Sequence, residues 1–392
     1  MRFDFNNSDW AALFRSRDNG SELFQSLVDN TPVLNLDLGW ALSQGHIADA
    51  PTPTADDGSA TFRIESSKLE AAPLMDLRAP LGESQQMDAE GAEEYVASIP
   101  DFIARGWTET AAQRAYKERM YAQLGNTDRI IANWIEKVLL RGLNSAKSTL
   151  NQIGAQLATK GKADYKGLGA GIYAKLHDAR IPAENFVKAG AKTWTDPTCK
   201  ILTQMRKIED NYRDKRGGYS GALTWRMTKN MYVNTFLQNQ EVRDLYASWC
   251  KANYIAYVEG MPITNEQFLQ SLTDIQGISP IEIVTEKERN KTRTTDTMVQ
   301  GWADNIAVLR PAGDMFEFKY ANVLEREMYT KYGAKSIDTT FATMLNGLVT
   351  AMNTTTDNGR LQEWHTDVMM SATPALLSFT NHEIVNTANA GE

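Results

Sequence analysis

The stretch "AYKERMYAQLGNTDRIIANWIEKVLLRGL", residues 115–143, constrains the fold of this chain most strongly. Its apolar residues recur at helical spacing, first in Tyr116, Met120 and Leu124 and then in Ile131, Trp134, Ile135, Val138 and Leu139. Thr108-Glu109-Thr110 is a suitable N-cap with an acid in the first turn, and Gly125 to Asp128 form a candidate break where a second segment is recapped. A helix over residues 108–142 spans about 50 Å, which exceeds the width of a small compact domain. The flanking elements must therefore extend along it, although periodicity alone is equally compatible with an ordinary long core helix.

Length and composition place the chain among soluble globular proteins with room for two or three lobes. It has 392 residues, of which 42% are hydrophobic and 23% charged, and its formal net charge is −8. The negative charge argues against nucleic-acid binding by bulk electrostatics. The two cysteines, Cys199 and Cys250, form no CxxC pair and are expected to be reduced core residues.

The sequence contains no recognisable secretory or membrane segment. The N-terminus "MRFDFNNSDWAALFRSRDNG" lacks an apolar core, and no stretch approaches about 18 uninterrupted apolar residues. We therefore expect a protein that is soluble and cytoplasmic when made, in which the sequons at Asn6 and Asn353 carry no meaning.

The first hundred residues predict extended, weakly packed elements. Residues 1–44 favour one or two short amphipathic helices, whose apolar members are Trp10, Leu13, Leu23, Phe24 and Leu27. Residues 45–62 are rich in Pro, Ala, Asp and Thr and predict an extended arm or linker. Within residues 66–107, alternation at 74–79 and 95–100 predicts two strand-like arms around a long acidic loop, a projecting hairpin. Such a hairpin is marginal alone and needs a surface to lie on.

The remainder alternates between helices and strands without βαβ regularity, which predicts the α+β class. Asp196-Pro197 opens a predicted helix that Gly217-Gly218 ends. Its apolar face is Ile201, Leu202, Met205, Ile208 and Tyr212, and its basic residues Arg206, Lys207, Arg213, Lys215 and Arg216 are interpreted as a solvated face rather than a partner contact. Residues 224–250 predict two packed helices, and Thr264 to Gln267 a capping box opening another. Strands are predicted at 281–284, 305–309 and 316–320, and residues 363–389 predict a strand, a turn at Pro374 and one or two terminal strands.

A search for catalytic or ligand-binding motifs returns no candidate. The "GLGAG" at 167–171 has Ile172 where a dinucleotide fingerprint needs its third glycine, and Lys162 is followed by Ala163 rather than Ser or Thr. The four histidines, His46, His177, His365 and His382, form no metal-ligand pattern, and no GxSxG is present. His365 and His382 are the one pair that the terminal strands could bring together, and a structural role is the simpler interpretation. We therefore assign no catalytic, cofactor-binding or metal-ligating residue and predict no cofactor.

Four segments carry a resemblance to a known family. They are "ERMYAQLGNTDRIIANWIEKVLLRGL", "KTWTDPTCKILTQMRKI", "NIAVLRPAGDMFEFKYANV" and "MMSATPALLSFTNHEIVNTA". In the order of these segments, the chain from about residue 60 onward resembles the major capsid proteins of tailed bacteriophages. Those proteins have the Hong Kong 97-type coat fold. Among them, the chain is most similar to the lambda-type coat-protein branch. The second and third segments are similar to that branch's Trp-Asp helix opening and its Pro-Ala-Gly segment after a strand.

The resemblance implies a division of the chain. Residues 1–60 would be an N-terminal arm reaching a neighbour, and 61–107 the extended loop lying across the adjacent subunit. Residues 108–219 with 335–392 would form the peripheral domain with its spine helix. Residues 220–334 would form the axial domain, whose tips meet around five- and six-fold axes, with the charged loop at 286–295 as the candidate tip.

The resemblance also implies a non-enzymatic function as the shell protein of a virion. Pentamers and hexamers of the chain would form an icosahedral head around double-stranded DNA, which its inner face would contact non-specifically. Scaffolding, portal and decoration proteins would be further partners, and assembly would take place in the bacterial cytoplasm, without membrane contact. The alternatives are an encapsulin-like nanocompartment shell, a soluble α+β enzyme without a recognisable motif, and a tail or connector protein.

Overall fold

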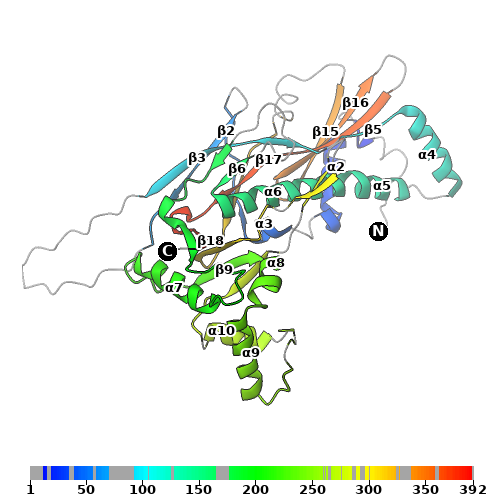
Figure 1. Ribbon diagram of the computed structural model, residues 1–392. Helices are drawn as coiled ribbons and strands as arrows, with labels where there is room; N and C mark the ends of the chain where they lie inside the picture. The colour runs from blue at the N-terminus through cyan, green and yellow to red at the C-terminus, as the bar shows by residue number, and fades with distance from the viewer. Residues whose placement is uncertain are drawn as a thin grey trace, which may run out of the picture.

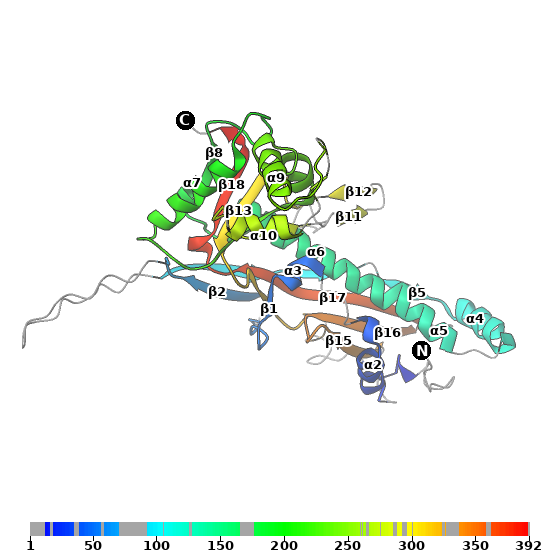
Figure 2. The ribbon, with the colours of Figure 1, turned by 90° about the horizontal axis from the view of Figure 1, so that it is seen from below.

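The computed structural model of the chain describes residues 12–15, 19–34, 39–55, 59–69, 92–104, 106–124, 128–164, 176–258, 260, 262–263, 266–274, 276–284, 288–291, 296–299, 301–323, 326, 337–357 and 362–390. Within them the chain forms an elongated first lobe and a second lobe that projects from one end of it (Figures 1 and 2). Each lobe has its own sheet and its own large cluster of buried apolar side chains.

A seven-stranded sheet forms the first lobe. Its order is β1-β14-β17-β16-β15, and two short strands, β4 and β5, also pair with β17. The bounds are β1 (Gly45–Ile47), β4 (Asp101–Ile103), β5 (Trp107–Glu109), β14 (Phe316–Tyr320), β15 (Ile337–Met344), β16 (Val349–Asp357) and β17 (Gln362–Leu376). All neighbours are antiparallel except β1 and β14, which are parallel. The 15-residue β17 is therefore the central strand along which the lobe is built.

The predicted rod is a long helix lying along β17 (Figure 2). It comprises α4 (Ala111–Leu124), α5 (Asp128–Trp134), a π-helical turn η3 (Ile135–Leu139) and α6 (Leu140–Lys160). From α5 to the end of α6 the helix is continuous, about 50 Å at ~1.5 Å per residue. Thr110 caps α4 by a reciprocal pair of hydrogen bonds with Gln113, so the predicted cap is confirmed at its last residue.

The rod does not end at residue 142 as predicted, but continues to Lys160. Gly142 faces the sheet, where a Cβ would lie 2.5 Å from the Cβ of Val368. It is a close-packing glycine rather than a helix stop, and the helix ends instead at Gly161, whose φ is +68°.

The second lobe is built on a five-stranded mixed sheet of order β10-β9-β13-β18-β8. The bounds are β8 (Phe186–Gly190), β9 (Leu223–Thr228), β10 (Ile281–Val284), β13 (Ile306–Pro311) and β18 (Glu383–Ala390). Its helices are α7 (Ile201–Asp214), α8 (Lys229–Met231), the π-helical turn η6 (Tyr232–Phe236), α9 (Gln240–Ala252) and α10 (Glu266–Asp274). The predicted apolar face of α7 is buried in this lobe throughout, together with Trp225.

A hairpin is present as predicted, but its first strand is formed by earlier residues than the predicted arm at 74–79. β2 (Ala60–Ser66) pairs antiparallel with β3 (Glu93–Ile99). Phe62, Ile64 and Tyr95 point into the first lobe and are buried, whereas Val96 on the outer face is 57% exposed. The base of the hairpin therefore lies on its own chain, and the predicted arm at 74–79 falls outside the described residues.

The N-terminal segment packs on the first lobe of its own chain. α2 (Gly20–Asp29) lies against β15, and η2 (Pro32–Leu34) and α3 (Gly39–Ser43) follow it. Phe24 and Phe14 contact the ring of Trp134 on the rod, at centroid distances of 5.6 Å and 6.0 Å. Of the predicted apolar set, Leu13, Phe24 and Leu27 are buried, and Trp10 falls outside the described residues. The predicted extended linker follows β14, since Ala48 and Thr52 donate to the carbonyls of Phe318 and Tyr320.

Three local predictions are wrong for identifiable reasons. α7 begins at Ile201, because Asp196 instead closes a turn, accepting from the backbone N–H and hydroxyl of Thr198. Residues 224–228 belong to β9, whose six residues are all buried and so show no alternation. Pro374 lies inside β17, where it pairs with Phe318. β14 flanks Pro374 on one side, and on the other side no described strand pairs with it because β4 stops pairing at Ser371, so the missing N–H of Pro374 is tolerated.

Two further hairpins complete the described chain. β6 (Lys162–Asp164) pairs with β7 (Leu176–Asp178), and β11 (Glu288–Lys291) with β12 (Asp296–Val299). The second pair includes Glu288–Lys291 of the predicted charged tip at 286–295, and the other residues of that tip fall outside the described residues. This pair lies beside α6, whereas the far end of the second lobe is formed by α9 and α10 (Figure 1).

Candidate functional site

The histidines and cysteines occupy separate, structural positions. His177 and His382 are buried, and burial lowers the pKa of His177 to about 4 and that of His382 to about 3, so both are neutral near pH 7. His382 bonds the carbonyl of Ala158 on α6, whereas His365 lies near Thr108 and Thr356 in the first lobe, so the two do not form a pair.

Cys199 and Cys250 are both free and buried, as predicted, and burial raises the pKa of Cys199 to about 11. Within the described ranges there is no group of three or more His, Cys, Asp or Glu side chains able to hold a metal. The same residues contain no helix with the length and apolarity needed to span a bilayer. The "GLGAG" segment falls outside them.

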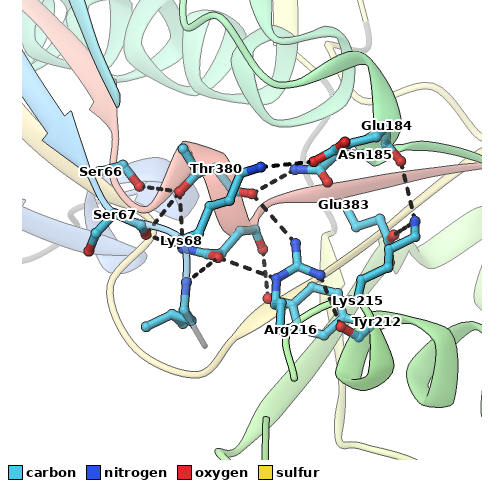
Figure 3. A network of polar contacts seen from close by, with 12 residues as sticks. Ser66, Ser67, Lys68, Glu184, Asn185, Tyr212, Lys215, Arg216, Thr380 and Glu383 are labelled. Atoms are coloured by element: carbon cyan, nitrogen blue, oxygen red, sulfur yellow. Dashed lines mark hydrogen bonds and ion pairs between the residues drawn. The ribbon is translucent and has the colours of Figure 1, made fainter. Parts of the chain in front are cut away.

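The base of the hairpin is held by a polar cluster that the sequence did not predict. We call Ser66, Ser67, Leu69, Thr380 and Asn381 the hairpin anchor, of which Ser66, Ser67 and Thr380 are labelled in Figure 3. Thr380 and Asn381 belong to the 3-10 turn η7 (Phe379–Asn381), between β17 and β18, and are 2% and 1% exposed. Asn381 Oδ1 accepts from the N–H of Leu69 at 2.9 Å, and its Nδ2 donates to the carbonyl of Ser67 at 2.8 Å.

The end of α7 supports this anchor from the second lobe. The hydroxyl of Tyr212 donates to the carbonyl of Asn381 at 2.9 Å, and Arg216 Nε donates to Asn381 Oδ1 at 3.3 Å. The guanidinium of Arg216 also stacks on the Tyr212 ring, 3.6 Å from its centroid. Arg216 is only 6% exposed, so the interpretation of the basic run as a solvated face is wrong for this residue. Lys215 bonds the buried carboxylate of Glu383 at 3.2 Å, and burial raises the pKa of that carboxylate.

Buried cationic side chains lie between the two lobes. Arg226 opposes Val308 in the β9–β13 pair and shares one face of the sheet with Arg310. Val308 belongs to the apolar cluster of the first lobe, so this face is turned toward that lobe. Arg226 pairs with Glu282 at 2.8 Å, and Arg310 donates to the carbonyl of Asp314. Burial, followed by the neighbouring Arg226, lowers the pKa of Arg310 to about 9.

Ten large apolar side chains of the described residues are exposed, and two groups of them lie toward the extremities of the molecule. They are Val96, Ile103, Tyr116, Met120, Phe186, Val233, Tyr254, Ile255, Val258 and Ile283. Tyr254, Ile255 and Val258 follow α9 at the far end of the second lobe, and Tyr116 and Met120 lie on α4 at the opposite end of the rod (Figure 1). Tyr254 is 98% exposed and has a φ of +57°, an unfavourable conformation for a tyrosine. A cluster of this kind is typical of an interaction surface.

An elongated sheet with a rod along it, a second lobe and a projecting hairpin are the features expected of the capsid fold. Comparison with solved structures confirms this fold. The chain is similar to a protein assigned as the capsid protein of an Escherichia coli CFT073 prophage, with a TM-score of 0.51 and 11% identity over 93% of this chain and 98% of that one. The fold is therefore the predicted α+β, Hong Kong 97-type capsid fold.

Two further solved structures are less similar to the chain. The capsid of cyanophage A-1(L) matches with a TM-score of 0.43 and 10% identity, over 89% of this chain and 92% of that one. The capsid of Staphylococcus phage Andhra matches with a TM-score of 0.40 and 9% identity, over 91% and 86%. No protein-family model and no curated protein sequence matches the chain.

Proposed function

We propose that this chain is the major capsid protein of a tailed bacteriophage. Pentamers and hexamers of it would form the icosahedral head that encloses double-stranded DNA. The observation that carries the proposal is the shared fold with the prophage capsid protein, which extends over nearly the full length of both chains. The expected relation to the lambda-type branch is part of this proposal.

The division of the chain into domains is also part of this proposal. Residues 61–107 would be the extended loop, and residues 108–219 with 335–392 the peripheral domain. The axial domain, proposed at 220–334, shares its core with α7 and β18 in the second lobe. The exposed end of that lobe, with Tyr254 and Val258, would meet copies of itself around the capsomer axes. Residues 1–60 would be the N-terminal arm. Because α2 in this range packs on the first lobe of its own chain, other residues of the arm would make the contact with a neighbouring subunit.

The proposed partners are other copies of the chain, with scaffolding, portal and decoration proteins. Packaged DNA would be contacted without sequence preference, in keeping with the net charge of −8. The protein would be a non-enzymatic virion component that is assembled in the bacterial cytoplasm. No catalytic, cofactor or metal residue is part of this proposal.

Expression of the chain alone, followed by size exclusion and negative-stain electron microscopy, tests the proposal. Closed icosahedral particles, or rings of five and six subunits, are the expected result. A clean monomer that persists when a scaffolding gene is co-expressed would rule out a shell function and favour an enzyme with a conventional pocket. Open tubes would favour a tail or connector protein. A neighbouring phage portal gene would distinguish the virion from an encapsulin-like compartment.

A further inference from the structure

The hairpin anchor fixes the chain at the point where β2 ends. In an extended segment, the carbonyl of one residue and the N–H of the residue two positions later point to the same edge. The carbonyl of Ser67 and the N–H of Leu69 are such a pair, and both bond the side-chain amide of Asn381. A primary amide places an acceptor and a donor side by side, as the peptide group of a neighbouring strand does. Asn381 therefore acts as a one-residue strand partner.

No other side chain offers the same pair of groups at this length. Aspartate keeps the acceptor but presents a second acceptor to the Ser67 carbonyl, and alanine has neither group. Thr380 adds to the anchor from the same turn, since its Oγ1 donates to Ser67 O at 3.0 Å and lies 2.7 Å from Ser66 Oγ.

The anchor belongs to a buried hub that also includes the second lobe. Tyr212 and Arg216 hold Asn381 from α7, and Asn185 Nδ2 donates to the carbonyl of Thr380 at 2.8 Å (Figure 3). Tyr212 and Asn185 are 0% and 2% exposed, so these bonds are shielded from water. A change in the position of α7 relative to η7 would therefore be transmitted to residues 67–69.

We propose that Asn381 is a positioning residue, which fixes the direction of the chain at Leu69 and ties it to the orientation of the second lobe. The inference rests on the proposed function in one respect: the segment that follows residue 69 would contact a second copy of this chain. Its direction then determines whether that contact forms with the correct geometry.

Hydrogen–deuterium exchange on the unassembled chain tests the anchor without reference to assembly. The test variant is Asn381→Asp, which has the same size but lacks the donor to Ser67. Peptides that cover residues 66–69 should exchange at least about tenfold faster than in the wild type, while peptides from β13 stay unchanged. Lys68→Ala is the matched control, because its ion pair with Glu184 is exposed and contributes little. It should change exchange at 66–69 by less than about twofold.

Ser66→Ala provides a second variant that leaves the hub intact, in case Asn381→Asp does not fold. It removes the contact to Thr380 from the hairpin side and should raise exchange at 66–69 by about threefold. Unchanged exchange in the folded variants would overturn the anchor.

Particles formed from the Asn381→Asp chain test the positioning role. They should be fewer and irregular, whereas those of Lys68→Ala should match the wild type. Faster exchange combined with normal particles would overturn the positioning role. If the wild type forms no particles even with a co-expressed scaffolding gene, the proposed function fails, and the exchange comparison still decides whether the anchor exists.

Discussion

The packing of the rod on β17 yields a prediction whose sign can be worked out. Gly142→Ala should destabilise the chain, although alanine is the better helix former by about 1 kcal/mol. The added Cβ would lie 2.5 Å from the Cβ and Cγ2 of Val368, whereas carbon atoms pack at about 3.5–4.0 Å. Moving a rod of this length by about 1 Å over a filled core costs about 1–3 kcal/mol. We therefore expect a net loss of up to about 2 kcal/mol in the free energy of unfolding.

Two substitutions in α6 provide the matched controls. At Gly154 a Cβ would lie 3.3 Å from the ring of Phe316, so Gly154→Ala should be neutral or slightly stabilising. Asn144 is exposed, and Asn144→Ala should stabilise by about 0.5 kcal/mol through helix propensity alone. Urea unfolding of the unassembled chain, followed by circular dichroism, measures all three. If Gly142→Ala is as stable as Gly154→Ala, the rod does not pack on β17 as closely as described.

Further predictions concern pH, a buried carboxylate and the exposed lobe end. The pKa of His382 is lower in the folded chain than its ordinary 6.5, so its contribution to stability is complete above pH 6.5 and is lost as pH falls toward 3. His382→Gln should make the free energy of unfolding less dependent on pH between pH 6 and pH 4, by up to about 1.4 kcal/mol per pH unit. Denaturant titrations at several pH values measure this slope, and an unchanged slope would contradict the prediction. Glu209 accepts from Trp225 Nε1 at 2.6 Å and from both the N–H and hydroxyl of Ser279, so Glu209→Ala should cost about 3 kcal/mol in thermal or urea unfolding. Tyr254→Asp should leave unfolding within about 0.5 kcal/mol of wild type but lower particle yield in electron microscopy; undiminished assembly would exclude the residue from an interface.

Several elements that were predicted correctly have one face buried and one exposed. In β3 and β14, buried and more exposed residues alternate, because each strand packs on the core from one side only. The apolar face of α7 was identified for the same reason, at a spacing of 3.6 residues.

The strands β9, β15 and β16 were not recognised. In β9 all six residues are buried, including Arg226, and the run resembled a helix because alternation was absent. The strands β15 and β16, with a tight turn at Leu345 and Asn346, were not predicted either, because polar residues such as Thr340, Thr350 and Asn353 occupy buried positions in them.

The hairpin anchor could not have been predicted from one sequence. Asn381 lies more than 300 residues from Ser67, and a single asparagine before a strand carries no signal of its partner. Its importance arises from tertiary contacts alone. The glycine at 142 shows the same limit, because nothing local distinguishes a packing glycine from a helix stop.

A cryo-electron microscopy reconstruction of particles formed by the chain is the most direct test of the proposed function. The expected map shows an icosahedral shell of pentamers and hexamers, in which the ends of the second lobes surround the axes and the segment beyond the hairpin anchor lies on a neighbouring copy. A chain that yields only monomers or small oligomers, or a particle whose second lobes point away from the axes, would contradict the proposal.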